Sequence, residues 1–336
     1  MSFRNIVAAL TLATMTLPAN AQTGDTKVYV ARFLDDKAAA ISYTFDDGLL
    51  DQYTVLFPKL KEYGIRGSFC INGNTINRNE AKLAANGTST DSLVIKKPRM
   101  TWAMIKEMSD QGQEMTSHGW AHTNLKKIEG EALRYEVQHN DTVIWQHTGK
   151  FPRTFFYPGN AKSPEKIAYA ERDRVGSRTF QVSIGSKRDD KWLREWVRRL
   201  IAEREWGVGM THGIVTGYDH FSDPEILWRH FEDVNTLCDS LWIGTFHDVC
   251  AYTKERDAVK LTIRTSGKRI KVTPKLSLNP AIFNHPLTLV VERGVKEARQ
   301  GGQALKVATI GGKSLVTFDP HGGCVTLRLS GKALKL

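Results

Sequence analysis

Cysteine is scarce in this chain of 336 residues, and the four thiols lack the spacing of a zinc finger. Small secreted proteins that are held together by disulfides need a denser framework, so that class is excluded. Cys238 and Cys250 could still pair in an oxidising compartment. Cys70 lies inside an apolar run, where we expect a buried, unreactive thiol.

Long hydrophobic runs, internal repeats and low-complexity tracts are also missing. No internal run is long and apolar enough to cross a membrane, so we expect no membrane span. The hydrophobic content of 41% and the charged content of 25% are those of an ordinary globular protein. A chain of this length can bury the core of one large unit and that of a smaller one.

The N-terminus is typical of a secretory signal peptide. Arg4 precedes an apolar stretch over residues 6–17, and the small residues Ala19 and Ala21 flank the expected cut. We therefore expect residues 1–21 to be removed after Ala21 and the mature protein to be secreted or periplasmic. No cysteine follows the cut, which argues against a lipoprotein anchor. An apolar N-terminal helix is the alternative interpretation.

Positive charge is concentrated in the last quarter of the chain. Residues 258–336 hold fourteen Lys and Arg against three Asp and Glu, whereas residues 22–257 are close to neutral. This asymmetry predicts two units with these bounds. The basic unit could bind an anionic polymer or a cell surface, or its cations could form a solvated sheet face. It lacks the interleaved aromatic residues of a nucleic-acid platform, so we expect no nucleic-acid partner.

Residues 38–255 alternate between strand-like and helix-like segments. For example, Ile41, Tyr43 and Phe45 alternate with small or polar residues, and a helical pattern then runs to Gly64. Such alternation predicts an α/β fold with a mostly parallel sheet, open or closed into a barrel. Residues 72–97 are polar and predict a looped insertion, and residues 224–241 predict a helix.

After residue 257 the helical periodicity disappears. Short strand-like runs are separated there by Gly-Gly pairs at 301–302, 311–312 and 322–323, which are typical of turns. This pattern predicts an all-β, sandwich-like C-terminal domain.

Candidate site residues follow the expected strands at four places along the chain. They are Asp46 and Asp47, His118, Pro158 and Gly159, and His212. Because the carboxyl ends of parallel strands meet at one edge of the sheet, where α/β enzymes carry their active sites, we expect these residues to converge.

The spacing of the histidines suits a metal centre. His118 and His122 stand four residues apart, which brings the two imidazoles together in a helix or a turn. A set of Asp and two His residues suits Zn²⁺ or a similar first-row ion. Asp46 and Asp47 cannot both face the same way on an extended chain, so one can bind the ion while the other acts as a base. Taken alone, either motif could be a structural turn or cap.

Three motifs in order resemble those of the polysaccharide deacetylases, which have the NodB-homology fold of carbohydrate esterase family 4. Residues 44–48 resemble the first motif, residues 117–122 the second and residues 210–213 the fifth. The resemblance spans roughly residues 38–255 and implies a distorted (β/α) barrel.

The resemblance also implies a role for each candidate residue. Asp46 would be the catalytic base and His212 the general acid. Asp47, His118 and His122 would hold a divalent metal, with zinc as the first expectation and cobalt, nickel or manganese as alternatives. The turn at Tyr157, Pro158 and Gly159 would contact the substrate and its developing oxyanion.

Two features depart from the family pattern. Phe156 stands where the third motif has an arginine that orients the catalytic carboxylate, and Arg178 and Arg188 are candidates to replace it. The fourth motif, an Asp with a nearby Trp, is matched only loosely by residues 189–192, and no role follows from it.

Other polar and aromatic residues have ordinary explanations. Asp219 and His220 could line a sugar site, but we expect them to belong to a surface loop, and we expect His247 to form local hydrogen bonds. Trp120 and Tyr157 could stack on a sugar ring or could pack in the protein interior.

The sequence thus predicts a secreted, metal-dependent hydrolase that removes acetyl groups from a glycan, with N-acetyl groups as the first expectation. An O-acetyl esterase of the same fold is one alternative. Others are an impaired glycan-binding protein on this scaffold, because the third-motif arginine is missing, and an amidase acting on a non-sugar, against which the signal peptide argues.

Overall fold

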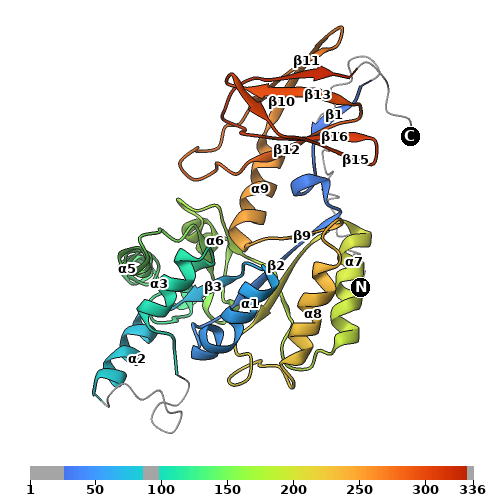
Figure 1. Cartoon of the computed structure of the whole chain (residues 1–336). Helices are drawn as coiled ribbons and strands as arrows, with labels where there is room; N and C mark the ends of the chain where they lie inside the picture. Colours follow the sequence, from blue (N-terminus) through green and yellow to red (C-terminus); the bar gives the residue numbers. More distant parts are fainter. Residues whose placement is uncertain (1–25, 86–97, 331–336) are drawn as a thin grey trace, which may run out of the picture.

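The computed structural model describes residues 26–85 and 98–330, which form an α/β unit and an all-β unit (Figure 1). The expected signal peptide lies outside these residues, as does the second half of the expected insertion. Among the described helices, none has the length and apolarity to cross a membrane.

The α/β unit is built on a parallel sheet of eight strands in the order β6-β5-β4-β3-β2-β8-β7, with β9 also paired to β2. The strands are β2 (Ala39–Phe45), β3 (Ser68–Ile71), β4 (Glu114–Ser117), β5 (Thr154–Phe156), β6 (Gly176–Arg178), β7 (Val182–Ser183), β8 (Trp206–Thr211) and β9 (Leu241–Ile243). The edge strands β6 and β7 are not paired with each other in the described chain, so the barrel is open there. The predicted distorted (β/α) barrel is confirmed.

Helices cover the outside of this sheet, and α7 and α8 lie side by side beyond β8 (Figure 1). The helices are α1 (Phe57–Tyr63), α2 (Gly73–Ala85), α3 (Trp102–Asp110), α4 (Gly130–Arg134), α5 (Asn140–Thr148), α6 (Pro164–Ala170), α7 (Asp190–Glu203), α8 (Glu225–Asn235) and α9 (Phe246–Ala258). The hydroxyl of Thr101 accepts from the Met104 N–H and caps α3.

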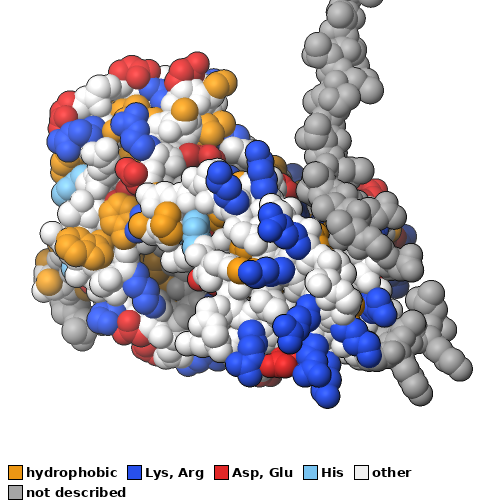
Figure 2. Space-filling model, turned by 90° about the horizontal axis from the view of Figure 1, so that it is seen from above, with side chains coloured by type: hydrophobic (Ala, Val, Ile, Leu, Met, Phe, Trp, Pro, Cys, Tyr) orange, Lys and Arg blue, Asp and Glu red, His pale blue; other side chains and the backbone are white. Residues whose placement is uncertain are grey.

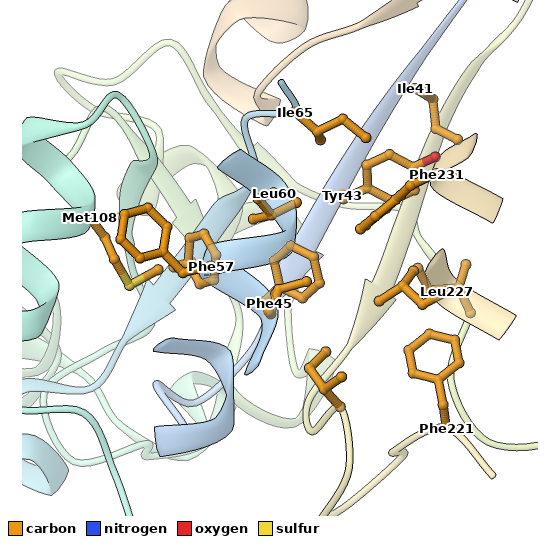
Figure 3. Packing of buried hydrophobic residues seen from close by; sticks show 14 of the residues in the cluster. Ile41, Tyr43, Phe45, Phe57, Leu60, Ile65, Met108, Phe221, Leu227 and Phe231 are labelled. Carbon is orange, nitrogen blue, oxygen red and sulfur yellow. The ribbon is translucent and has the colours of Figure 1, made fainter. Parts of the chain in front are cut away.

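Strand β2 is the centre of the sheet, and its alternation sorts side chains between two environments. Ile41, Tyr43 and Phe45 pack beneath the helices, where the ring of Tyr43 lies 5.1 Å from that of Phe231 (Figure 3). Ser42 and Thr44 point to the other face, and Thr44 donates to the Gly209 carbonyl. Because side chains alternate along a strand, the residue after Phe45 continues the face of Thr44, inside the barrel.

The all-β unit consists of two antiparallel sheets packed around one apolar core, which confirms the sandwich-like prediction. One sheet has the order β1-β12-β16-β15 and the other β10-β11-β17-β13-β14. The strands are β1 (Val28–Val30), β10 (Lys260–Ser266), β11 (Arg269–Lys275), β12 (Leu287–Val291), β13 (Val295–Gln300), β14 (Gln303–Leu305), β15 (Val307–Ile310), β16 (Lys313–Phe318) and β17 (Val325–Leu329). The predicted Gly-Gly turns at 301–302 and 311–312 have positive φ at both residues.

The N-terminal strand belongs to this all-β unit. β1 pairs with β12, with Val28 opposite Val291, although more than two hundred residues separate them. The shared core also takes in Ala40 at the start of β2 and Trp242 of β9. The all-β unit therefore packs against the end of the barrel at which the strands begin. The division at residues 257 and 258 stays a prediction, and residues 28–30 cross it.

Two local expectations were wrong, and one possibility that the sequence left open is not realised. The predicted loop from residue 72 contains helix α2, because Ile76 is buried and Asn79 exchanges hydrogen bonds with the Arg99 backbone, whereas most of the other residues of the helix are partly or fully exposed. The helix predicted to reach residue 241 ends at Asn235, and β9 begins at residue 241. All four cysteines are free, so Cys238 and Cys250 are not paired.

Candidate active site

Asp46 and Asp47 follow the end of β2 and turn to opposite sides. Asp46 is only 4% exposed and points into the barrel, on the face that Thr44 shares. Asp47 adopts a left-handed backbone (φ 78°), which Asp tolerates better than most residues. This turn aims its carboxylate at His118 and His122. The predicted divergence of the two acids is thus present.

Arg178 holds Asp46 through two parallel hydrogen bonds. Its Nη1 lies 2.7 Å from Asp46 Oδ1, and its Nη2 lies 2.5 Å from Oδ2. The same Nη1 donates to the Thr44 hydroxyl over 2.7 Å. Such a bidentate pair fixes the plane of the carboxylate as well as its position.

Arg178 lies beside Phe156, the residue that stands where the third motif of the resembled family has an arginine. Phe156 on β5 and Arg178 on β6 are register partners, and the guanidinium lies 4.2 Å from the centre of the Phe156 ring. A side chain from the neighbouring strand therefore reaches the carboxylate that the third-motif arginine would orient. Of the two candidates named from the sequence, Arg188 lies elsewhere: it stacks on Trp192 and bonds to the Ser183 carbonyl.

The charge of Arg178 decides the protonation state of Asp46. Burial alone would raise the pKa of this carboxyl group, but the guanidinium charge and its hydrogen bonds outweigh burial and hold the pKa well below its usual range. Asp46 is therefore ionised at any physiological pH. The Cys70 thiol adds a 3.2 Å contact to Asp46 Oδ1, and burial raises the pKa of Cys70 well above its usual value, so it stays protonated.

Asp47, His118 and His122 form a three-residue cluster that could hold a metal ion. Their ligand atoms all lie within 4.8 Å of one another, and Asp47 Oδ1 is 3.6 Å from His118 Nε2 and 3.5 Å from His122 Nε2. The structure reaches this arrangement through a turn and not a helix, since His122 has a left-handed backbone.

Three features of this cluster fit a divalent ion. Asp47 Oδ1 is buried and has no hydrogen-bond partner among the described residues. His118 Nδ1 lies 2.8 Å from the Phe156 carbonyl, which fixes the tautomer with a proton on Nδ1 and leaves Nε2 free to face Asp47. Burial also lowers the pKa of His118, which keeps it in the neutral form that a ligand needs.

A second cluster, of Asp46, Cys70 and His118, is less suited to an ion. Both carboxylate oxygens of Asp46 are already paired with Arg178, and the raised pKa of Cys70 disfavours the thiolate that binds metals. The first cluster is therefore the candidate metal centre.

Glu136 holds the loop that carries His122. Its buried carboxylate accepts from the backbone N–H groups of Ala121 and Thr123, over 3.0 and 2.8 Å. The loop comes so close that a Cβ on Gly119 would lie 2.6 Å from Glu136 Oε1. A side chain of the short π-helix η4 (Tyr135–His139) thus sets the position of an exposed candidate ligand.

His212 follows β8 and is tied to the end of β2 by buried polar groups. The Gln52 amide donates to the backbone carbonyls of both Asp46 and His212, over 2.7 Å in each case. Oδ2 of Asp51 accepts from three consecutive N–H groups that begin at Ile214. His212 Nδ1 has no partner among the described residues. The structure therefore brings His212 to the same edge as the two acids.

The turn from Tyr157 to Gly159 lies at the end of β5. It is next to the candidate metal centre, because the carbonyl of the preceding residue, Phe156, bonds to His118. The Tyr157 ring is 2% exposed and its hydroxyl donates to Ser177, so it packs inside the protein and cannot stack on a sugar. Trp120 is half-buried against His139 and Tyr135, which also favours packing.

The remaining polar residues have local structural partners. Asp219 accepts from Ser183 and Ser186, His220 bonds to the Gly217 carbonyl, and His247 lies 3.2 Å from Asp248. In the loosely matched fourth motif, Asp189 caps α7 by accepting from the Trp192 N–H. Asp189 therefore has a structural role at the start of α7.

Sequence reasoning missed Asp51, Gln52, Arg99 and Glu136. Arg99 donates to the Asp47 carbonyl over 2.7 Å, and its Nη1 lies 3.6 Å from Asp47 Oδ2. Asp51 and Gln52 lie within five positions of Asp47, so their closeness in sequence could have indicated that they belong to the site. Nothing in the sequence marks Arg99 or Glu136, because their partners depend on how loops fold back.

The polysaccharide deacetylase family model matches residues 34–175 of this chain. That segment contains the first motif, both histidines of the second, and the turn at residues 157–159. His212 and the all-β unit lie outside it. The match supports the predicted resemblance over this segment.

Among curated proteins, the chain is 21% identical over 148 residues to the peptidoglycan-N-acetylglucosamine deacetylase of Listeria monocytogenes. The alignment covers 44% of this chain and spans about a quarter of that protein, 26%.

Among solved structures, two neighbours come from Bacillus species. The peptidoglycan deacetylase PdaC of Bacillus subtilis is 15% identical, with a TM-score of 0.43 over 66% of this chain and 94% of that one. A family 4 pseudoenzyme of Bacillus anthracis is 15% identical, with a TM-score of 0.44 over 63% of this chain and 65% of that one.

Replacing Glu136 by Ala should weaken zinc binding roughly tenfold, because second-layer groups that orient a ligand typically contribute at least this much. The change removes the carboxylate that accepts from the Ala121 and Thr123 N–H groups, so the loop that carries His122 is no longer held in place. Competition with a chromogenic chelator measures the affinity, and Glu129→Ala, an exposed acid on the same stretch, is the control. Equal affinity in the Glu136 variant and the wild type would contradict this role.

Proposed function

We propose that this chain is a metal-dependent deacetylase that hydrolyses N-acetyl groups on a glycan. One arrangement carries the proposal. An ionised, rigidly held carboxylate (Asp46) stands next to a metal-binding set whose carboxylate oxygen has no protein partner (Asp47). The match of residues 34–175 to the polysaccharide deacetylase family and the similarity to a peptidoglycan deacetylase support the choice of substrate class.

Asp47, His118 and His122 would hold the ion. When bound, the ion would act as a Lewis acid, which lowers the pKa of a water molecule and polarises the acetyl carbonyl. The mixed Asp and His donors suit zinc, and cobalt, nickel or manganese fit the same set. Arg99 and the loop held by Glu136 keep these ligands in place.

Asp46 accepts a proton from the water that attacks the acetyl carbon. The bidentate contact with Arg178 keeps this carboxylate charged and fixes its orientation, so no reorganisation is needed as the proton arrives. The carbon–nitrogen bond then breaks, and His212 donates a proton to the departing amine. The products are acetate and a free amino sugar. A backbone N–H of the turn at residues 157–159 is our candidate for stabilising the oxyanion.

An O-acetyl esterase is the second candidate function, because the same groups can act when the leaving group is an alkoxide. The alternative of a catalytically impaired protein that only binds glycans is less well supported. Its basis was the missing third-motif arginine, and Arg178 supplies a guanidinium to Asp46 from the next strand.

The place of action follows from the N-terminal segment. Residues 1–21 have the pattern of a signal peptide, and we propose that the protein works outside the cytoplasm, where cell-wall and other glycans are exposed.

Acetate release from N-acetylglucosamine oligomers tests the function. The zinc-loaded protein should release acetate, and both a chelator and Asp46→Asn should lower the rate at least a hundredfold, because the ion and the base each act in the rate-limiting chemistry. Asp223→Asn, an exposed acid outside the site, is the control. No release from any acetylated glycan by the zinc-loaded protein would refute the proposal, and a preference for acetylated xylan would favour the esterase.

Exchanging Phe156 and Arg178 tests the relocated arginine. Arg178→Phe alone should remove most of the activity and, because the pKa of Asp46 then rises, move the acidic limb of the rate profile to higher pH. Adding Phe156→Arg places a guanidinium on the register partner and should restore part of the rate and return the limb to lower pH. A double variant with the profile of the single one would show that Arg178 does not act on Asp46 as proposed.

A further inference from the structure

The second sheet of the all-β unit presents a row of exposed cations to solvent. In strands β10, β11 and β17, alternate residues such as Ile263, Ile270 and Leu327 are buried in the sandwich, so the residues between them face outward. The outward cations, which we call the cationic face, are Lys260, Arg264, Arg269, Lys271, Lys275 and Arg328.

The register of the strands places these cations directly opposite one another. The three pairs are Lys260 with Lys275, Arg264 with Lys271, and Arg269 with Arg328. Directly opposed side chains on neighbouring strands have Cβ atoms about 5 Å apart, and like charges in such positions destabilise a sheet. Ordinary solvated sheets avoid this cost by placing acids opposite bases. The repeated pairing of cations therefore suggests that an external anion offsets their repulsion.

In the described part of the chain, only one acid offsets this repulsion, and it does so only in part: the charge of Arg328 helps to lower the pKa of Glu297, after the larger contribution of Arg299. None of the six cations forms an ion pair with an acidic side chain there. Glu297 is the acid nearest in register, opposite Arg328, but its carboxylate pairs with Arg299 on its own strand. From above, this end of the molecule shows Lys and Arg side chains in clear excess over acidic ones (Figure 2).

The other residues on this face indicate the kind of partner. Thr262, Thr273, Thr326 and Ser266 stand between the cations and offer hydroxyl groups at regular spacing. Hydroxyl groups can exchange hydrogen bonds with a sugar chain while the cations meet its acidic groups. The cationic face has no aromatic side chain for stacking nucleotide bases, and no apolar side chain for insertion into a bilayer.

We propose that the cationic face binds an acidic polysaccharide, a glycan chain with regularly repeated anionic groups. The surface lies far from the candidate active site. The all-β unit packs on the end of the barrel near Ala40, the second residue of β2, whereas Asp46 and Asp47 follow the opposite end of that strand. A polymer held on the cationic face leaves the catalytic edge open, so the enzyme stays near glycans while its site samples acetylated sugars.

Binding of polygalacturonate, measured by calorimetry with the full mature chain, tests the proposal. The face variant carries Arg264→Gln, Lys271→Gln and Arg328→Gln. The control carries Lys82→Gln, Arg198→Gln and Arg199→Gln on helices α2 and α7, and loses the same three charges. We expect the face variant to raise the dissociation constant at least tenfold and the control less than twofold, with wild-type binding weakening as salt is added.

The face variant should unfold at the same temperature as the wild type or higher, because it removes opposed like charges, and this result separates lost binding from lost folding. Equal weakening in the two triple variants would overturn the proposal. So would tighter binding of the wild type to anionic phospholipid vesicles, to single-stranded DNA or to neutral dextran than to polygalacturonate. The assay does not use acetate release, so its outcome is independent of the proposed deacetylase activity.

Discussion

The buried ion pair between Asp46 and Arg178 is the interaction on which the rest of the site depends. A carboxylate that is 4% exposed would take up a proton if burial alone acted on it, and the guanidinium prevents this. Removing either member would leave an unpaired charge inside the barrel, which is strongly unfavourable. The pair also joins the edge strand β6 to the central strand β2, across the interior of a barrel that is open at that edge.

The fixed position of Asp46 has consequences for its neighbours. Because Asp46 is turned inward, the left-handed backbone at Asp47 can aim the second carboxylate at the two histidines. Buried side chains then hold the loops around them. Glu136 binds the backbone of the His122 loop, and Asp51 binds that of the loop after His212. In each case a carboxylate satisfies backbone N–H groups that the irregular loops leave unpaired.

The sequence predicted the parts of the site that are encoded locally. Asp46, Asp47, His118 and His122 belong to short motifs at strand ends, and a parallel sheet brings such ends together without further information. Arg178 could be named only as one of two candidates, because its role depends on the register between β5 and β6, and register is set by packing and not by a local pattern. Helix α2 was missed since most of its residues face solvent, and the pairing of β1 with β12 depends on a contact across nearly the whole chain.

The two acids of the first motif carry different roles in this account, and metal affinity separates them most directly. Zinc dissociation constants should be measured by chelator competition for the wild type, Asp46→Asn and Asp47→Asn. Asp46→Asn keeps a side-chain oxygen that can accept from Arg178, and it should bind zinc about as tightly as the wild type. Asp47→Asn should bind zinc at least tenfold more weakly, because of these two acids only Asp47 has a carboxylate oxygen without a partner among the described residues. The reverse pattern, or equal weakening in both variants, would contradict the account.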